Sequence, residues 1–120
     1  MNKRAEGKKY EDAAVLFLEK HGVSILERNF RCRLGEIDII GLHNDMLVFF
    51  EVKYRSGDGR GQATEAVDLK KQKIISKVSD NFRVYKKQYA NMQVRYDVIA
   101  IDNDRIKWIP AAFEYSGSGF

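Results

Sequence analysis

The chain has 120 residues, of which 44% are hydrophobic and 32% are charged, as in an ordinary globular domain. Its 21 lysines and arginines outnumber 17 aspartates and glutamates, and the resulting formal charge of +4 permits polyanion binding without requiring it. The single cysteine, Cys32, excludes an internal disulfide and a cysteine-rich zinc site, and no apolar run is long enough to span a membrane. We therefore expect a cytoplasmic protein with no membrane association.

The first predicted element is a helix over residues 10–21, because its apolar residues recur at helical spacing and Gly22 follows them. A second helical pattern covers residues 62 to about 89, where Ile75, Val78 and Phe82 repeat at steps of three and four. Between the two helices lies a glycine-rich loop at residues 56–61.

Branched and aromatic residues predict strands at 23–30, 36–42, 46–54, 94–101 and 105–109. A tight turn between the second and third of these strands predicts a hairpin. The order of a helix, three strands, a long helix and two strands indicates an α/β domain with a mixed sheet over residues 1–115. Residues 116–120, with the sequence SGSGF, are expected to form a flexible tail.

Two acids occupy the predicted hairpin. If the turn is centred between Asn44 and Asp45, Asp38 lies opposite Glu51, with Cβ atoms about 5 Å apart, where like charges repel unless a cation lies between them. Lys53 shares a strand face with Glu51. Carboxylates suit Mg²⁺ or Mn²⁺, which activates water and stabilises charge on a phosphate, and Lys53 would orient that water or stabilise the transition state.

The alternative interpretation places both acids on a solvated sheet face. The strands are apolar on both faces, which is typical of central strands and favours acids that have a partner. Glu11 lies four and seven residues before Val15 and Leu18, so it can point from the first helix toward the sheet. A glutamate there also suits the positive end of the helix dipole, so its role stays open.

Several motifs occur together in one order along the chain. They are Gly7-xxx-Glu11, Arg28-Asn29, Gly35-Glu36-Ile37-Asp38-Ile39-Ile40, Phe50-Glu51-Val52-Lys53-Tyr54-Arg55, Lys70 with Lys73, and Arg95-Tyr96-Asp97-Val98. In this combination the chain resembles the YraN-like family of small bacterial proteins, over about residues 4–109. That family is similar to archaeal Holliday junction resolvases and to the PD-(D/E)XK nucleases.

The resemblance implies a restriction-endonuclease-like α/β/α fold with a central mixed sheet, and nucleic acid binding. By position, Asp38 matches the first acid of the nuclease motif, Glu51 the second acid and Lys53 its lysine, which makes these three residues the expected catalytic set. Glu11 matches the helix glutamate of the resolvases. It joins Asp38 and Glu51 as an expected ligand of Mg²⁺ or Mn²⁺. Ile37 stands where the motif's name has proline.

Basic residues near this site are candidates for binding nucleic acid. The expected set is Arg55, Arg60, Lys70, Lys73 and Lys77. The two arginines flank the glycine-rich loop and the lysines share one side of the long helix, where they could follow a phosphate backbone. A solvated helix face explains the lysines equally well. Arg28, Arg31 and Arg33 form another basic cluster with the same two interpretations.

The sequence thus predicts a metal-dependent endonuclease or resolvase that hydrolyses phosphodiester bonds, with DNA as its partner. The alternative is a nucleic-acid-binding or scaffold module of a DNA repair or processing system, with little turnover of its own. A homodimer, which a resolvase needs to cut two symmetric strands, stays open. DNA or RNA and branched or linear substrates also stay open, because phosphate contacts carry no sequence information.

Overall fold

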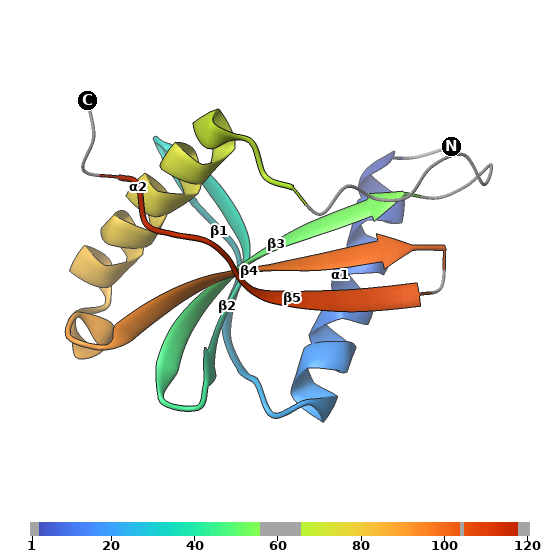
Figure 1. The fold of residues 1–120 in the computed structure, drawn as a ribbon, viewed down its shortest axis with the longest axis horizontal. Helices are drawn as coiled ribbons and strands as arrows, with labels where there is room; N and C mark the ends of the chain where they lie inside the picture. Colours follow the sequence, from blue (N-terminus) through green and yellow to red (C-terminus); the bar gives the residue numbers. More distant parts are fainter. Residues whose placement is uncertain (1–2, 56–65, 104, 118–120) are drawn as a thin grey trace.

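A five-stranded sheet forms the centre of the computed structural model, which describes residues 3–55, 66–103 and 105–117 (Figure 1). The strands are β1 (Ser24–Cys32), β2 (Gly35–His43), β3 (Met46–Arg55), β4 (Gln93–Asp102) and β5 (Arg105–Phe113), and they lie across the sheet in chain order. β3 and β4 are parallel, whereas all other neighbours are antiparallel. The parallel pair follows from the chain crossing one face of the sheet between these strands.

The two main helices cover opposite faces of this sheet. Helix α1 (Lys3–Lys20) precedes β1, and α2 (Leu69–Tyr85) with the short 3-10 helix η1 (Lys87–Tyr89) connects β3 to β4. Ala14 and Leu18 of α1 pack with Phe50, while Phe82 of α2 packs with Phe49. Adjacent residues of β3 thus contribute to different core clusters, as the alternation of side chains requires. The predicted α/β/α arrangement with a mixed sheet is confirmed and is consistent with a nuclease-like fold.

The hairpin between β2 and β3 has the predicted turn. Asn44 and Asp45 both have positive φ, 51° and 66°, which is typical of the two-residue turns that match the twist of paired strands. Five residue pairs from Ile39↔Phe50 to His43↔Met46 follow the predicted register. The turn chemistry therefore sets which residues of β2 and β3 approach each other.

The second helix begins later than the sequence pattern indicates. α2 starts at Leu69, where the Asp68 side chain accepts a hydrogen bond from the Lys71 backbone N–H at 2.8 Å. The expected helix over 62–89 is therefore wrong for 66–68, whereas 62–65 lie outside the described residues. At the other end, Lys86 leaves helical geometry at φ −110° and ψ 81°, and η1 follows. The cap at Asp68 explains the start, because its side chain satisfies an N–H that lacks a helical partner.

The last strand and the tail are more ordered than expected. β5 reaches Phe113 and includes Pro110, which an edge strand tolerates because one side of its backbone has no neighbour. Beyond it, the Ser116 N–H donates to Ser76 Oγ of α2 at 3.0 Å. The start of the expected 116–120 tail is thus hydrogen-bonded to the helix, and residues 118–120 lie outside the described residues.

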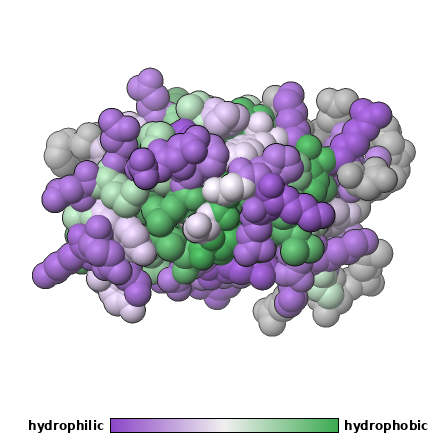
Figure 2. All heavy atoms as spheres, turned by 90° about the horizontal axis from the view of Figure 1, so that it is seen from below, coloured by the Kyte–Doolittle hydropathy of each residue, from purple (hydrophilic) through white to green (hydrophobic). Residues whose placement is uncertain are grey.

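The protein surface is largely hydrophilic (Figure 2), as expected from a chain in which 32% of residues are charged. Hydrophilic side chains cover much of the face shown in Figure 2, around a hydrophobic area in its middle. Within the described residues, no helix combines the length and hydrophobicity needed to cross a membrane.

Candidate active site

The candidate site lies where β2 and β3 separate. Their ladder ends at Ile39↔Phe50, so Asp38 and Glu51 are the next residue on each strand. The two strands run apart from there (Figure 1). The predicted register is confirmed up to this point, but Asp38 and Glu51 are not themselves a ladder pair. Instead, Asp38 Oδ2 accepts a hydrogen bond from the Val52 backbone N–H at 2.7 Å.

A local break in the alternation of β2 accompanies this separation. Ile37 belongs to the core cluster on the α2 side, whereas Ile39 belongs to the cluster on the α1 side. Opposite them, Asn29 of β1 has φ 53°, a left-handed conformation that asparagine adopts more readily than most residues. The irregular backbone leaves Asp38 at the opening between the strands rather than on a regular sheet face.

Asp38 is a carboxylic acid whose surroundings disfavour its charge. Burial and the negative charge of Glu51 together raise the pKa of Asp38 to about 7, although the hydrogen bond from Val52 opposes this rise. Glu11 and Glu36 contribute smaller repulsions. A cation between Asp38 and Glu51 would relieve both the repulsion and the cost of burying charge.

Glu51 and Lys53 face α2, as the sequence predicts for residues that share a strand face. Glu51 has a 13% exposed side chain, and its Oε2 lies 3.6 Å from Lys71 Nζ of α2. Lys53 Nζ donates to the Ala66 carbonyl at 2.7 Å. Lys71 is thus a contact of the site that the sequence analysis missed. The helical spacing indicates this contact, because Lys71 stands four residues before the buried Ile75 and therefore on the helix face that packs on the sheet.

Glu11 faces the sheet, as its helical position predicts, and its side chain is only 13% exposed. Its Oε1 lies 2.7 Å from Arg28 Nη2 and accepts a hydrogen bond from Asn29 Nδ2 at 3.0 Å. Arg28 also contacts Asp12, and this hydrogen bond lowers the pKa of Asp12. Glu11 is therefore held by β1 in this structure, beside the opening where Asp38 lies.

The carboxylates of the site are oxygen donors of the kind that a divalent cation binds. Within the described part of the chain, no three histidine, cysteine, aspartate or glutamate side chains come together closely enough to hold a metal. Asp38 and Glu51 still fit Mg²⁺ or Mn²⁺, because Mg²⁺ is commonly bound through one or two carboxylates and retains water and substrate phosphate as its other ligands. Glu11 would have to exchange Arg28 for the metal to become a third ligand.

A groove of about 650 Å³ opens beside Glu11 and Asp38 on the α1 side of the sheet. Its lining residues are Gly7, Lys8, Glu11, Arg28, Asn29, Arg31, Asp38, Val52 and Tyr54. Two arginines of the second basic cluster thus border the site. The groove combines cations, buried acids and an aromatic ring, which are the groups needed to bind phosphate and a nucleobase.

The described members of the expected nucleic-acid set do not line this groove. Lys70, Lys73 and Lys77 are exposed on α2, and Arg55 is exposed at the end of β3. Arg60 lies outside the described residues. The lysines therefore occupy a solvated helix face, and their binding role stays a prediction.

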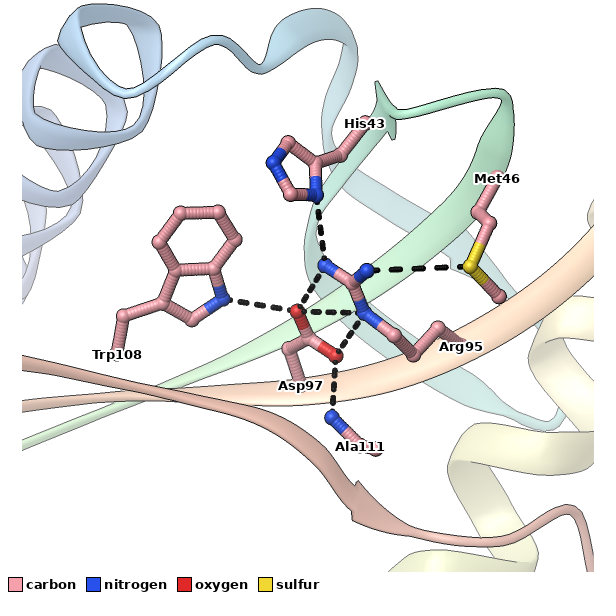
Figure 3. Close-up of polar contacts among 6 residues, drawn as sticks. All are labelled: His43, Met46, Arg95, Asp97, Trp108 and Ala111. Carbon is pink, nitrogen blue, oxygen red and sulfur yellow. Dashed lines mark hydrogen bonds and ion pairs between the residues drawn. The ribbon is translucent and has the colours of Figure 1, made fainter.

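A second polar cluster stabilises the sheet elsewhere, around the fully buried Asp97 (Figure 3). Its carboxylate accepts hydrogen bonds from Arg95 Nη2 at 2.8 Å, from Trp108 Nε1 at 2.8 Å and from the Ala111 backbone N–H at 2.9 Å. Arg95 and Asp97 thus form an ion pair within β4. Because both carboxylate oxygens are occupied, this cluster joins β4 to β5 and does not form a candidate metal site.

The fold and groove define an α/β protein with partly buried carboxylates at a break in its sheet. The chain belongs to the uncharacterised protein family UPF0102, whose model matches residues 10–101. This membership confirms the family recognised from the sequence motifs.

Similar proteins occur in several bacteria. A UPF0102 protein of Lachnoclostridium phytofermentans is 39% identical over 118 residues, covering 98% of this chain and all of the relative. Another from Hahella chejuensis is 44% identical and covers 89% of this chain and 88% of the relative. A third, from Caldicellulosiruptor bescii, is 46% identical, and the match covers 84% of this chain and 85% of the relative. The relatives therefore match this domain over almost its whole length.

Proposed function

We propose that this protein is a metal-dependent phosphodiesterase acting on nucleic acid, with its active site at Asp38 and Glu51. The observation that carries the proposal is the pair of largely buried carboxylates at the separation of β2 and β3, of which Asp38 has a raised pKa caused by burial and by Glu51. A carboxyl such as Asp38, with a raised pKa and a place in a groove, is typical of a site that binds a cation or transfers protons.

Asp38 and Glu51 would hold Mg²⁺ or Mn²⁺, which when bound would polarise the phosphate and acidify a water molecule. The hydrogen bond from Val52 orients the Asp38 carboxylate. In hydrolysis the water oxygen forms a bond to phosphorus, the bond from phosphorus to one sugar oxygen breaks, and that oxygen leaves with the electron pair. The proton released by the water balances the proton that the sugar oxygen takes up.

Positive charge from α2 and β3 would complete the site. Lys71 of α2 contacts Glu51. Lys53 lies on the same face of β3 as Glu51, and its Nζ donates a hydrogen bond to the Ala66 carbonyl. Either lysine would stabilise negative charge that develops on the phosphate. On the opposite side of the sheet, Arg28 and Arg31 border the groove and would position the phosphate backbone.

The test measures metal binding and cleavage in the same proteins. Titration calorimetry with Mg²⁺ and Mn²⁺ should show binding to wild type that is lost in Asp38→Ala and Glu51→Ala. A gel assay on single-stranded, flapped and branched DNA should show cleavage by wild type, and the variants that lose metal binding should also lose this cleavage. Glu19→Ala is the matched control, because Glu19 is an exposed acid on α1, and it should behave as wild type. Metal binding that survives in both site variants would refute the proposal.

A binding module without turnover is the second candidate function. It is favoured by the pairing of Glu11 with Arg28 and Asn29, which occupies the expected third ligand. In that case the Asp38→Ala, Glu51→Ala double variant should keep its DNA affinity or bind more tightly, since negative charge has been removed, and wild type should not cut.

A further inference from the structure

Tyr54 is an exposed aromatic residue at the candidate site. It follows Val52 on the same face of β3, and its residue is 40% exposed. Both residues line the groove that contains Asp38. Because a strand advances about 3.3 Å per residue, the ring attaches about 7 Å along β3 from Val52, whose N–H holds the Asp38 carboxylate.

The orientation of this ring is fixed from one side. Tyr54 stacks on Tyr10 of α1 with ring centroids 4.5 Å apart and an interplanar angle of 18°. Tyr10 is itself only 8% exposed, so it is anchored between helix and sheet. Tyr10 therefore covers one face of the Tyr54 ring. The exposed surface of Tyr54 belongs to the other ring face and to the ring edge.

Cations border the same groove. Arg31 has a 75% exposed side chain and Lys8 a 73% exposed side chain, and their ion pairs with Glu36 and Asp12 are solvated contacts that a phosphate can replace at little cost. A supported aromatic face beside exchangeable cations is the arrangement that binds single strands, in which bases stack on aromatic rings and the backbone follows positive charge.

We propose that Tyr54 stacks an unpaired nucleobase next to the candidate site at Asp38, so that the substrate class is single-stranded or flapped DNA. This inference rests on the proposed phosphodiesterase function for its substrate. In a regular duplex each base already has neighbours on both of its faces, and a base must leave the stack before it can lie on a protein ring. The ring therefore selects a strand that has a free base beside the site.

The proposal is tested by fluorescence anisotropy with a labelled single strand and the matching duplex, in buffer without divalent cations so that no cleavage occurs. Tyr54→Ala should weaken binding of the single strand at least about fivefold and leave the affinity for duplex unchanged. Tyr54→Phe should bind as wild type because it retains the ring. Tyr85→Ala is the matched control, since Tyr85 is a 68% exposed tyrosine on α2.

A second measurement needs no protein variant. Wild type is titrated with a hairpin DNA whose single-stranded tail carries an abasic site at each position in turn. One position should lose at least about fivefold in affinity, and the same substitution should have no further effect in Tyr54→Ala. A flat abasic profile, equal losses for Tyr54→Ala and Tyr54→Phe, or equal losses on duplex and single strand would each overturn the stacking role.

The outcomes separate this inference from the function on which it rests. Stacking on Tyr54 with no cleavage in Mg²⁺ or Mn²⁺ would leave a single-strand binding site and refute the phosphodiesterase. Cleavage that requires Asp38 but is indifferent to Tyr54 would support the phosphodiesterase and refute the stacking. Absence of any DNA binding by wild type, both without divalent cations and with Mg²⁺, would refute both proposals.

Discussion

The raised pKa of Asp38 predicts that the stability of this protein falls as the pH rises through neutrality. Burial and Glu51 raise the pKa of Asp38 from 3.8 to about 7 in the folded state. Between these values the folded carboxyl is protonated and the unfolded carboxyl is ionised, so the folded state binds the additional proton. Its stabilising contribution is therefore complete below about pH 4 and is lost as the pH rises through about 7.

The size of this effect follows from the two pKa values. Each pH unit between them removes about 1.4 kcal/mol from the free energy of unfolding. Between about pH 5 and about pH 8 the loss amounts to about 2–3 kcal/mol, because the folded carboxyl finishes its titration near 7. Asp38→Asn keeps a neutral side chain with an oxygen that accepts from Val52, so it should abolish this loss and exceed wild type in stability at about pH 8.

Urea unfolding at each pH, followed by the fluorescence of Trp108, measures this change in stability. Trp108 is the only tryptophan, and its ring centroid lies 6.3 Å from that of Phe50 in the core. Asp12→Asn is the control, since the pKa of Asp12 is lowered by Arg28 and its contribution is lost only on acidification. It should keep the wild-type slope between about pH 5 and about pH 8. Parallel pH profiles for wild type and Asp38→Asn would refute a raised pKa at Asp38.

Three further substitutions test the fold by urea unfolding. Asp97→Ala should lower the free energy of unfolding by about 3–5 kcal/mol, because it leaves the 15% exposed Arg95 without its carboxylate partner. A loss below about 1 kcal/mol would contradict this. Gly41→Ala should cost about 1–3 kcal/mol, since its Cβ would meet the Ser24 carbonyl oxygen at 2.9 Å, and unchanged stability would show that β1 can move. Asp68→Ala should cost about 1 kcal/mol through the lost cap, and a neutral result would mean that packing alone fixes the start of α2.

The architecture was predictable because its signals are local. Helical periodicity, alternating or continuous apolar runs and the Asn44–Asp45 turn each depend on a few neighbouring residues, and together they gave the order of elements and the register of the hairpin. The start of α2 was not predicted correctly, because the cap at Asp68 competes with a pattern that continues before it. The extension of β5 through Pro110 was missed because proline usually argues against a strand.

The candidate site was predictable in its residues but not in its geometry. The register placed Asp38 near Glu51, yet the sequence contains no sign that β2 changes faces between Ile37 and Ile39. That change occurs beside Asn29 of the neighbouring strand, which has a positive φ of 53°. The pairing of Arg28 with Glu11 joins residues far apart in the chain and required the packing of α1 on the sheet.

The two sides of the site differ in how firmly the backbone holds them. β3 pairs with β4 along its whole length, up to Arg55↔Asp102, whereas its pairing with β2 stops at Phe50. Glu51 and Tyr54 therefore lie on a strand that is hydrogen-bonded on one side and open on the other. An opening in the middle of a sheet normally leaves backbone groups without partners. Here the Asp38 carboxylate accepts a hydrogen bond from the Val52 N–H, which β2 no longer pairs. The same side chain also lines the groove in which we place the phosphate.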